Sequence, residues 1–206
     1  MSIYLRNFTE ADLDEIVHLE RTAWPEDVRA SRAKLRDRLQ TFPEGFFGIY
    51  ETDLLVGMAS CQVVTFSQRN PLQSWDTITA NGWISKTHDL EGNCLHFVSI
   101  CVLPDRRHFG TATRLNQARL SLAEKIGLKW ALTDTRLPGL RHYLNGLQSK
   151  TPNEYVEEII SGVVAEPVVR MYLNLGFQAL GLIPDCMASD LESANYGLAM
   201  AKKIGQ

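Results

Sequence analysis

One segment constrains the fold of this chain more than any other. Between residues 95 and 126, an apolar run is followed by a turn and then by a helical pattern. Residues 95–101 (Leu-His-Phe-Val-Ser-Ile-Cys) have the composition of a buried strand, and apolar residues recur every three or four positions from Leu115 to Ile126. The segment therefore predicts a strand that leads through a turn into a long helix.

The turn itself has the pattern Arg-x-x-Gly-x-Ala, from Arg107 to Ala112. A glycine lets the backbone approach a ligand closely, and the unpaired N–H groups at a helix start point toward it. An arginine adds a fixed positive charge. The turn therefore predicts a cradle for an anion such as pyrophosphate, with an ordinary helix start that binds nothing as the alternative.

Composition and charge narrow the class of protein. The chain has 206 residues, 45% of them hydrophobic, and we expect one large domain. Its net charge of -3 argues against nucleic-acid binding, and no apolar run is long enough to span a membrane. The N-terminal residues do not resemble a signal peptide. The four cysteines stand apart without metal-type spacing, so we expect a cytoplasmic protein with reduced thiols and no metal.

The remaining pattern predicts an α/β protein in which helices flank a mixed sheet of six to seven strands. Helices are expected after the candidate caps Thr9 and Ser31, and near residues 107–126, 151–160 and 167–175. Residues 137–150 are expected to form a loop. The polar segment 67–92 is too long for a simple connection, so we expect it to be functional or locally structured. Strands are expected at residues 3–8, 46–51, 54–66, 95–102, 129–135, 177–186 and 196–201.

With these features in this order, the chain resembles the GNAT superfamily of acyl-CoA-dependent N-acyltransferases. The resemblance spans nearly all of residues 1–206 and rests on three motifs. The first is the strand ending in Ile100-Cys101-Val102-x-Pro104, and the second is the turn from Arg107 to Ala112. The third is Tyr172-x-x-x-Gly176-Phe177, which is similar to the end of the last major helix in the family.

A narrower resemblance concerns the GNAT-like domain that precedes a carbon–nitrogen hydrolase (nitrilase-type) domain in some bacterial proteins. It rests on residues 74–82, on the turn 88–93 and on residues 136–139. We expect a single GNAT-like domain here, without the hydrolase. In those relatives the central strand has a glutamate where this chain has Ser99. This difference leaves the identity of the general base open.

The family resemblance implies that acetyl-CoA (or another acyl-CoA) is the cofactor, and that Tyr172 is the general acid for the leaving thiolate. A phenol can give its proton to a developing thiolate because the two reference pKa values, near 10 for the phenol and about 8.5 for a thiol, lie close together. Tyr172 could instead only pack between helix and sheet. The cofactor-binding residues implied are Ile100, Cys101 and Val102 for pantetheine, and Arg107, His108, Phe109, Gly110, Thr111 and Ala112 for pyrophosphate.

The general base and the acceptor site are less constrained by the sequence. The candidates for the base are His96, Asp76, His88, Glu166 and a water chain that reaches Ser99. On a regular strand His96 and Ser99 face opposite sides, because they are an odd number of residues apart. Trp24 and Trp75 could wall a pocket. The candidates for acceptor binding are Asp76, Asn81, Arg136 and His142, with solvated loop residues as the alternative.

Two functions remain open at this point. The first is transfer of an acyl group to a small amine or a lysine side chain. The second is a non-catalytic acyl-CoA-binding module that regulates or docks an amide hydrolase, which the serine at position 99 favours. No nucleic acid or membrane is expected as a partner.

Overall fold

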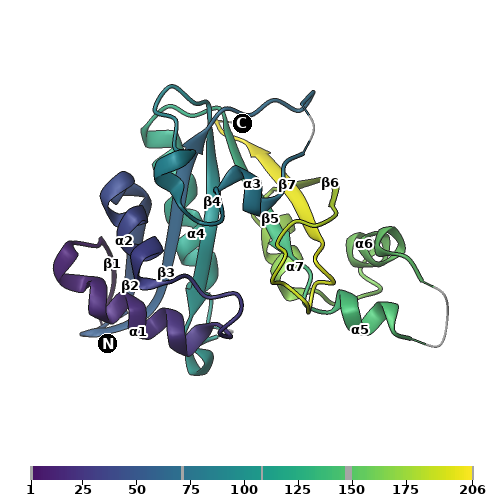
Figure 1. Ribbon diagram of the computed structural model, residues 1–206, viewed down its shortest axis with the longest axis horizontal. Coiled ribbons are helices and arrows are strands. Elements are labelled where there is room, and N and C mark those ends of the chain that lie inside the picture. Colours follow the sequence, from purple (N-terminus) through teal and green to yellow (C-terminus); the bar gives the residue numbers. More distant parts are fainter. Residues whose placement is uncertain (1, 71, 108, 147–149, 206) are drawn as a thin grey trace.

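A seven-stranded mixed sheet forms the centre of the molecule (Figure 1). The computed structural model describes residues 2–70, 72–107, 109–146 and 150–205. All neighbouring strands are antiparallel except β4 and β5, which are parallel. In sheet order the strands are β1 (Ile3–Asn7), β2 (Phe46–Glu51), β3 (Leu54–Val64), β4 (Cys94–Val102), β5 (Trp130–Arg136), β7 (Gly197–Lys203) and β6 (Gln178–Ile183).

Helices cover both faces of this sheet. In Figure 1, α1 (Leu13–Ala23) and α2 (Arg32–Thr41) lie in front of the N-terminal strands, and α4 (Thr111–Lys125) lies behind them. On the C-terminal side α7 (Pro167–Asn174) packs against β5, and α6 (Pro152–Ser161) packs against α7 and α5 (Leu140–Leu144). The α/β fold with a mixed sheet that the sequence predicts is confirmed.

The predicted helix caps explain where several helices begin. The Thr9 and Asp12 side chains form a capping box just before α1, and the Ser31 hydroxyl accepts a hydrogen bond from the Lys34 N–H at the start of α2. Gly110 precedes α4 with a φ of 79°, a left-handed conformation that glycine adopts at little cost.

Two predicted elements differ from the structure. The long helix begins at Thr111 rather than at residue 107, because Pro104–Arg106 forms a 3-10 turn and the left-handed Gly110 interrupts the helix. The segment 137–150, expected to be a loop, contains the short helix α5. The insertion 67–92 is locally structured, as expected, with α3 (Trp75–Ile78) and a 3-10 turn at Ile84–Lys86.

The sheet opens between β4 and β5. These strands pair only from Cys94 to Phe97 on β4 and from Trp130 to Thr133 on β5. Beyond Phe97, β4 pairs with β3 alone, while β5 continues beside β7 as far as Arg136. The carboxyl-terminal halves of the two parallel strands therefore border a gap in which neither pairs with the other.

A β-bulge in β4 reverses the expected orientation of one residue. Gln62 on β3 pairs with His96, and Ser60 pairs with Ser99, with a register shift between Ser60 and Cys61. Because Gln62 and Ser60 share a face of β3, their partners also share a face. The prediction that His96 and Ser99 face opposite sides is therefore wrong: Val98 is the extra residue of the bulge.

An ion pair fixes the loop before β7 to the end of β5. The Arg136 guanidinium donates to both carboxylate oxygens of Asp190, at 2.7 and 2.5 Å, and also to Glu192 at 3.1 Å. The Asp190 side chain is almost fully buried. Burial acts to raise the pKa of Asp190, but the hydrogen bonds from Arg136 and Ser193 outweigh it and lower the pKa below its usual value.

We predict that Asp190→Asn lowers the free energy of unfolding by about 2 kcal/mol at pH 7, because the change leaves Arg136 partly unpaired. A carboxylate with a lowered pKa stabilises the fold above its unfolded pKa of about 4, and this contribution disappears as the pH falls through the folded pKa. Denaturant titrations of wild type and variant should therefore begin to converge below about pH 4 and agree only below the folded pKa. Glu192→Gln, which changes the exposed partner of Arg136, should cost less than about 0.5 kcal/mol at any pH. Equal losses for both variants would contradict this account.

Candidate active site

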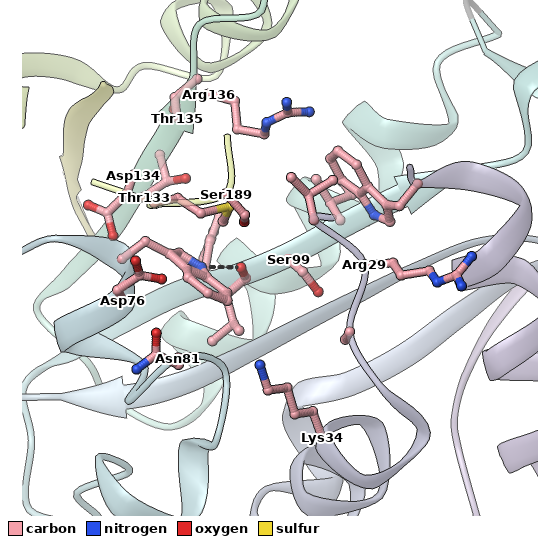
Figure 2. Close-up of a pocket in the computed structure, with 18 of the residues that line it drawn as sticks. Arg29, Lys34, Asp76, Asn81, Ser99, Thr133, Asp134, Thr135, Arg136 and Ser189 are labelled. Atoms are coloured by element: carbon pink, nitrogen blue, oxygen red, sulfur yellow. Dashed lines mark hydrogen bonds between the residues drawn. The ribbon is translucent and has the colours of Figure 1, made fainter. Parts of the chain in front are cut away.

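A cavity of about 350 Å³ occupies the gap between β4 and β5. Figure 2 shows Thr133, Asp134, Thr135 and Arg136 of β5 on one side of it and Lys34 of α2 on another. Ser99 of β4 lies between them. The charged residues in its wall are the cations Arg29, Lys34, Arg38, Arg119 and Arg136 and the acids Glu20, Asp27, Asp76 and Asp134.

Two side chains satisfy carbonyl groups of β4 beside the gap. The Trp75 indole N–H donates to the Val98 carbonyl at 2.8 Å, and the Arg119 Nη2 donates to the Ser99 carbonyl at 2.6 Å. These bonds replace pairing with a neighbouring strand, which a buried carbonyl otherwise requires. Trp75 belongs to the insertion and Arg119 to α4, so two separate elements hold the gap open.

Tyr172 projects from α7 into the wall of this cavity and is 3% exposed. Its ring packs edge-on against Phe177, with ring centroids 5.2 Å apart, and lies beside Phe97 at 6.4 Å. The Arg119 guanidinium stacks over the same Phe97 ring, 4.6 Å from its centroid. Tyr172 is therefore a buried phenol in the cavity wall, close to a buried cation.

The turn before α4 places backbone N–H groups ahead of the first helical hydrogen bond. The first helical hydrogen bond runs from the Arg114 N–H to the Gly110 carbonyl at 3.0 Å, so the N–H groups of residues 111–113 precede the helical ladder. A Cβ at Gly110 would meet nothing within 4 Å, so the space in front of this glycine is open. Thr111 is buried, while Phe109 is 73% exposed and His108 lies outside the described residues.

The Arg107 side chain turns back onto the protein. Its guanidinium donates to the Ala23 carbonyl at 3.1 Å, and its Nε donates to the Val102 carbonyl at 3.4 Å. It therefore ties the end of α1 to β4. Ile100 lines the cavity, whereas the side chains of Cys101 and Val102 are buried beside it.

Ser99 lines the cavity and is held by a buried cation. The Arg38 Nη1 donates to the Ser99 hydroxyl at 2.9 Å, and the hydroxyls of Ser99 and Ser60 lie 2.9 Å apart. Arg38 is 2% exposed. The position that carries a glutamate in the resembled relatives is thus a neutral hydroxyl here, in direct contact with a guanidinium.

Three candidates for the general base lie outside the cavity wall. His96 is fully buried, with Nε2 2.8 Å from Asp134 and Nδ1 3.2 Å from the Gln62 amide nitrogen. His88 accepts a hydrogen bond from the Val63 N–H at 3.0 Å, and burial lowers its pKa. Glu166 accepts hydrogen bonds from Tyr155 at 2.9 Å and from the Gly139 N–H at 3.2 Å. All three occupy structural hydrogen-bond networks.

The acceptor candidates are partly brought together. Asp76, Asn81 and Arg136 line the cavity, and Figure 2 shows Asp76 and Asn81 on the same side of it. Asp76 accepts a hydrogen bond from the Ala188 N–H at 3.0 Å. The charge of Arg136 is balanced by Asp190 and Glu192. His142 is exposed on α5, away from the residues that line the cavity.

Sequence reasoning missed the cations Lys34, Arg38 and Arg119. Arg38 lies three residues after Leu35 and next to Leu39, both buried on α2, and Arg119 lies four residues after the buried Leu115 on α4. An arginine at a core position of an amphipathic helix is the signal that could have identified both.

Acyl-CoA fits this arrangement on two structural observations. Along the gap, β4 and β5 do not pair with each other. Two polar atoms of cavity-lining residues, Arg119 Nε and Thr135 Oγ1, are buried there without a hydrogen-bond partner within the described part of the chain. At one end of β4, the turn before α4 offers N–H groups to an anion. A search of the helices among the described residues finds none that is long and apolar enough to cross a membrane.

The chain is similar to two curated proteins of Bacillus subtilis. It is 28% identical over 206 residues to the uncharacterized N-acetyltransferase YkwB, covering 98% of this chain and 89% of YkwB. It is also 28% identical over 196 residues to the probable hydrolase YhcX, covering 95% of this chain but only 37% of YhcX. The chain therefore spans little more than a third of the length of that second relative.

Solved structures share the fold. The loading GNATL domain of CurA from Lyngbya majuscula superimposes with a TM-score of 0.82 at 21% identity, covering 98% of each chain. The GphF GNAT-like decarboxylase, solved with isobutyryl-CoA, superimposes with a TM-score of 0.77 at 22% identity, covering 97% of this chain and 98% of that one. The sequence pattern of the Acetyltransferase (GNAT) family matches residues 13–143, which is more than half of the chain. The chain therefore belongs to the GNAT acetyltransferase family, whose members transfer acyl groups from acyl-CoA.

Proposed function

We propose that this protein transfers an acetyl group from acetyl-CoA to the primary amine of a small molecule or a lysine side chain. The observation that carries the proposal is the position of Tyr172, a buried phenol in the wall of the cavity between β4 and β5. The gap supplies the space for a thioester, and the charged cavity supplies the space for a polar acceptor. Membership of the family supports the use of acyl-CoA.

The cofactor would lie along the open edge of β4. The N–H groups of residues 111–113 would bind the pyrophosphate, because a helix start favours negative charge. The backbone of residues 100–102, which has no partner on the β5 side, would bind the pantetheine arm. Arg107 would contribute by positioning the turn, since its side chain is bound to the Ala23 and Val102 carbonyls.

The reaction needs one bond to form, one to break and one proton to move. The neutral amine nitrogen attacks the thioester carbonyl carbon, an amide forms, and the carbon–sulfur bond breaks to release the thiolate of CoA. Tyr172 then gives its phenolic proton to that thiolate and regains one, by way of solvent, from the nitrogen that has formed the new bond. The products are an N-acetylated amine and free CoA thiol.

Arg119 would assist this step through its charge. It is fully buried, it stacks on Phe97, and its bond to the Ser99 carbonyl fixes it beside the gap. A cation held in a poorly hydrated site stabilises a developing negative charge more strongly than it would in water. Arg119 would therefore lower the free energy of the leaving thiolate and of a transient phenolate.

The acceptor amine arrives protonated, because an amine of the lysine type has a reference pKa near 10.4. Asp76 lines the cavity, and its carboxylate would bind the ammonium form. The ammonium would then give its proton either to Asp76 or to water near Ser99. The three candidates outside the cavity wall have no such access to the amine.

A non-catalytic acyl-CoA-binding module is the second candidate function. The neutral Ser99 hydroxyl, already bound to Arg38, favours it because it leaves that position without a carboxylate base. Such a module would associate with an amide hydrolase, as the similarity to a probable hydrolase suggests. Measuring free-thiol release from acetyl-CoA with a panel of primary amines separates the two: release requires an enzyme, whereas tight binding without release indicates a module.

We predict that Gly110→Asp raises the dissociation constant for acetyl-CoA by roughly 100-fold or more, because it places a carboxylate where the pyrophosphate would bind. Calorimetric titration with acetyl-CoA measures the effect. Gly127→Asp is the matched control: Gly127 ends the same helix with a φ of 74° and equally open space. Affinities that fall equally in both variants would contradict the pyrophosphate site.

We predict that Tyr172→Phe lowers kcat by roughly 10²–10⁴ while the affinity for acetyl-CoA changes little, because only the proton donor is removed. Stopped-flow detection of released thiol measures kcat, and calorimetry measures affinity. Tyr155→Phe is the control, since this hydroxyl bonds to Glu166 away from the cavity. Near wild-type turnover in Tyr172→Phe would leave Tyr172 with a packing role only.

A further inference from the structure

Two cations of α2 face the cavity from the same side of the helix. Lys34 and Arg38 lie four residues apart, so they occupy one face of the helix, one turn from each other. Both line the cavity, as do Asn81 and Ser99, and Figure 2 shows the Lys34 ammonium directed into it. Within the described part of the chain, no carboxylate lies within ion-pair distance of either side chain.

Among the described residues, the hydrogen-bond partners of Arg38 are all neutral oxygens. Its Nε donates to the Gly82 carbonyl at 3.4 Å, and its Nη1 donates to the hydroxyls of Ser60 at 3.4 Å and Ser99 at 2.9 Å. The side chain is 2% exposed. A buried charge is costly unless an opposite charge compensates it, and a guanidinium matches the geometry of a carboxylate. The cavity wall therefore contains a buried cation, Arg38, that has no direct counter-ion within the described part of the chain.

Glu20 is the acid whose charge acts most strongly on Arg38, but it is bound elsewhere. Its carboxylate accepts hydrogen bonds from the Ala30 N–H at 2.7 Å and from the Cys101 thiol at 3.9 Å. Burial raises the pKa of Glu20, and the charge of Arg38 opposes that shift. Glu20 thus offsets the positive charge of Arg38 without forming an ion pair with it.

We propose that Lys34 and Arg38 form a binding site for a substrate carboxylate in this cavity. The proposal rests on the proposed acyl transfer for the role of the bound molecule, although binding itself does not require turnover. Lys34 supplies a half-buried point charge, and Arg38 supplies a fixed cation whose hydroxyl partner Ser99 also lines the cavity. Arg136, one of the acceptor-binding candidates from the sequence, is less suited to bind a carboxylate because Asp190 and Glu192 already balance its charge.

The hydroxyl of Ser99 marks where the carboxylate would lie. A longer acidic side chain at this position would reach the same guanidinium, because the Ser99 hydroxyl already touches Arg38 at 2.9 Å. Ser99→Glu should therefore fill the site from within the protein. Ser99→Gln is its neutral control, with nearly the same shape and no charge.

Equilibrium binding of matched probes tests the proposal. Each ω-amino acid of three to six carbons is compared with the n-alkylamine of the same length, in the presence of CoA. Fluorescence of Trp24 and Trp75, which line the cavity, reports binding without any transfer. A parallel arm compares succinyl-CoA with butyryl-CoA, so that a carboxylate on the acyl donor is distinguished from one on the acceptor.

We expect the carboxylate-bearing probe of one arm to bind at least about tenfold more tightly than its neutral match. Lys34→Gln should reduce that preference severalfold, and Ser99→Glu should abolish it because it fills the site and neutralises its charge. Ser99→Gln fills the same space but leaves both cations uncompensated, so it should retain part of the preference. Arg36→Gln removes the same charge from the opposite side of α2, where Arg36 pairs with Glu10, and should change nothing. The proposal is overturned if neither arm shows a preference, or if the preference is insensitive to Lys34→Gln and Ser99→Glu. Carboxylate binding without any acyl transfer would refute the proposed function alone.

Discussion

The active-site region of this protein depends on two hydrogen bonds that compensate for a missing strand contact. Where β4 leaves β5, the Val98 and Ser99 carbonyls would be costly to bury without donors. Trp75 and Arg119 supply those donors at 2.8 and 2.6 Å. Because both donors are side chains, the strands can diverge without loss of backbone hydrogen bonding. The cavity lies in the gap that this divergence leaves, and Ser99 and Tyr172 both line it.

The same arrangement places charge where an acyl transfer would use it. Arg119 is buried on the Tyr172 side of the gap, and Lys34 and Arg38 lie on the α2 side. Buried cations reduce the stability of a fold unless they are compensated. Here they surround a site in which a thiolate would develop and a polar acceptor would bind. The cost to stability is thus concentrated at the cavity, as is common at functional sites.

The sequence predicted the strands and main helices in their order along the chain, because hydrophobic period, capping residues and glycine turns are local signals. It placed the Arg107–Ala112 turn before the long helix and Tyr172 on the last helix for the same reason. It could not predict the bulge at Val98, which depends on pairing with β3, and the expectation that His96 and Ser99 face opposite sides is wrong for that reason. It could not show that Arg136 is paired with Asp190, 54 residues away, or that Arg38 reaches Ser99 across 61 residues. Such contacts are set by tertiary packing rather than by local pattern.

The most direct test of this account is a crystal structure of the protein with acetyl-CoA. The account predicts that the pyrophosphate contacts the N–H groups of residues 111–113 and that the thioester lies in the gap between β4 and β5. The thioester sulfur should then lie within hydrogen-bond reach of the Tyr172 hydroxyl. A cofactor bound outside the gap, or a thioester sulfur far from Tyr172, would contradict the account.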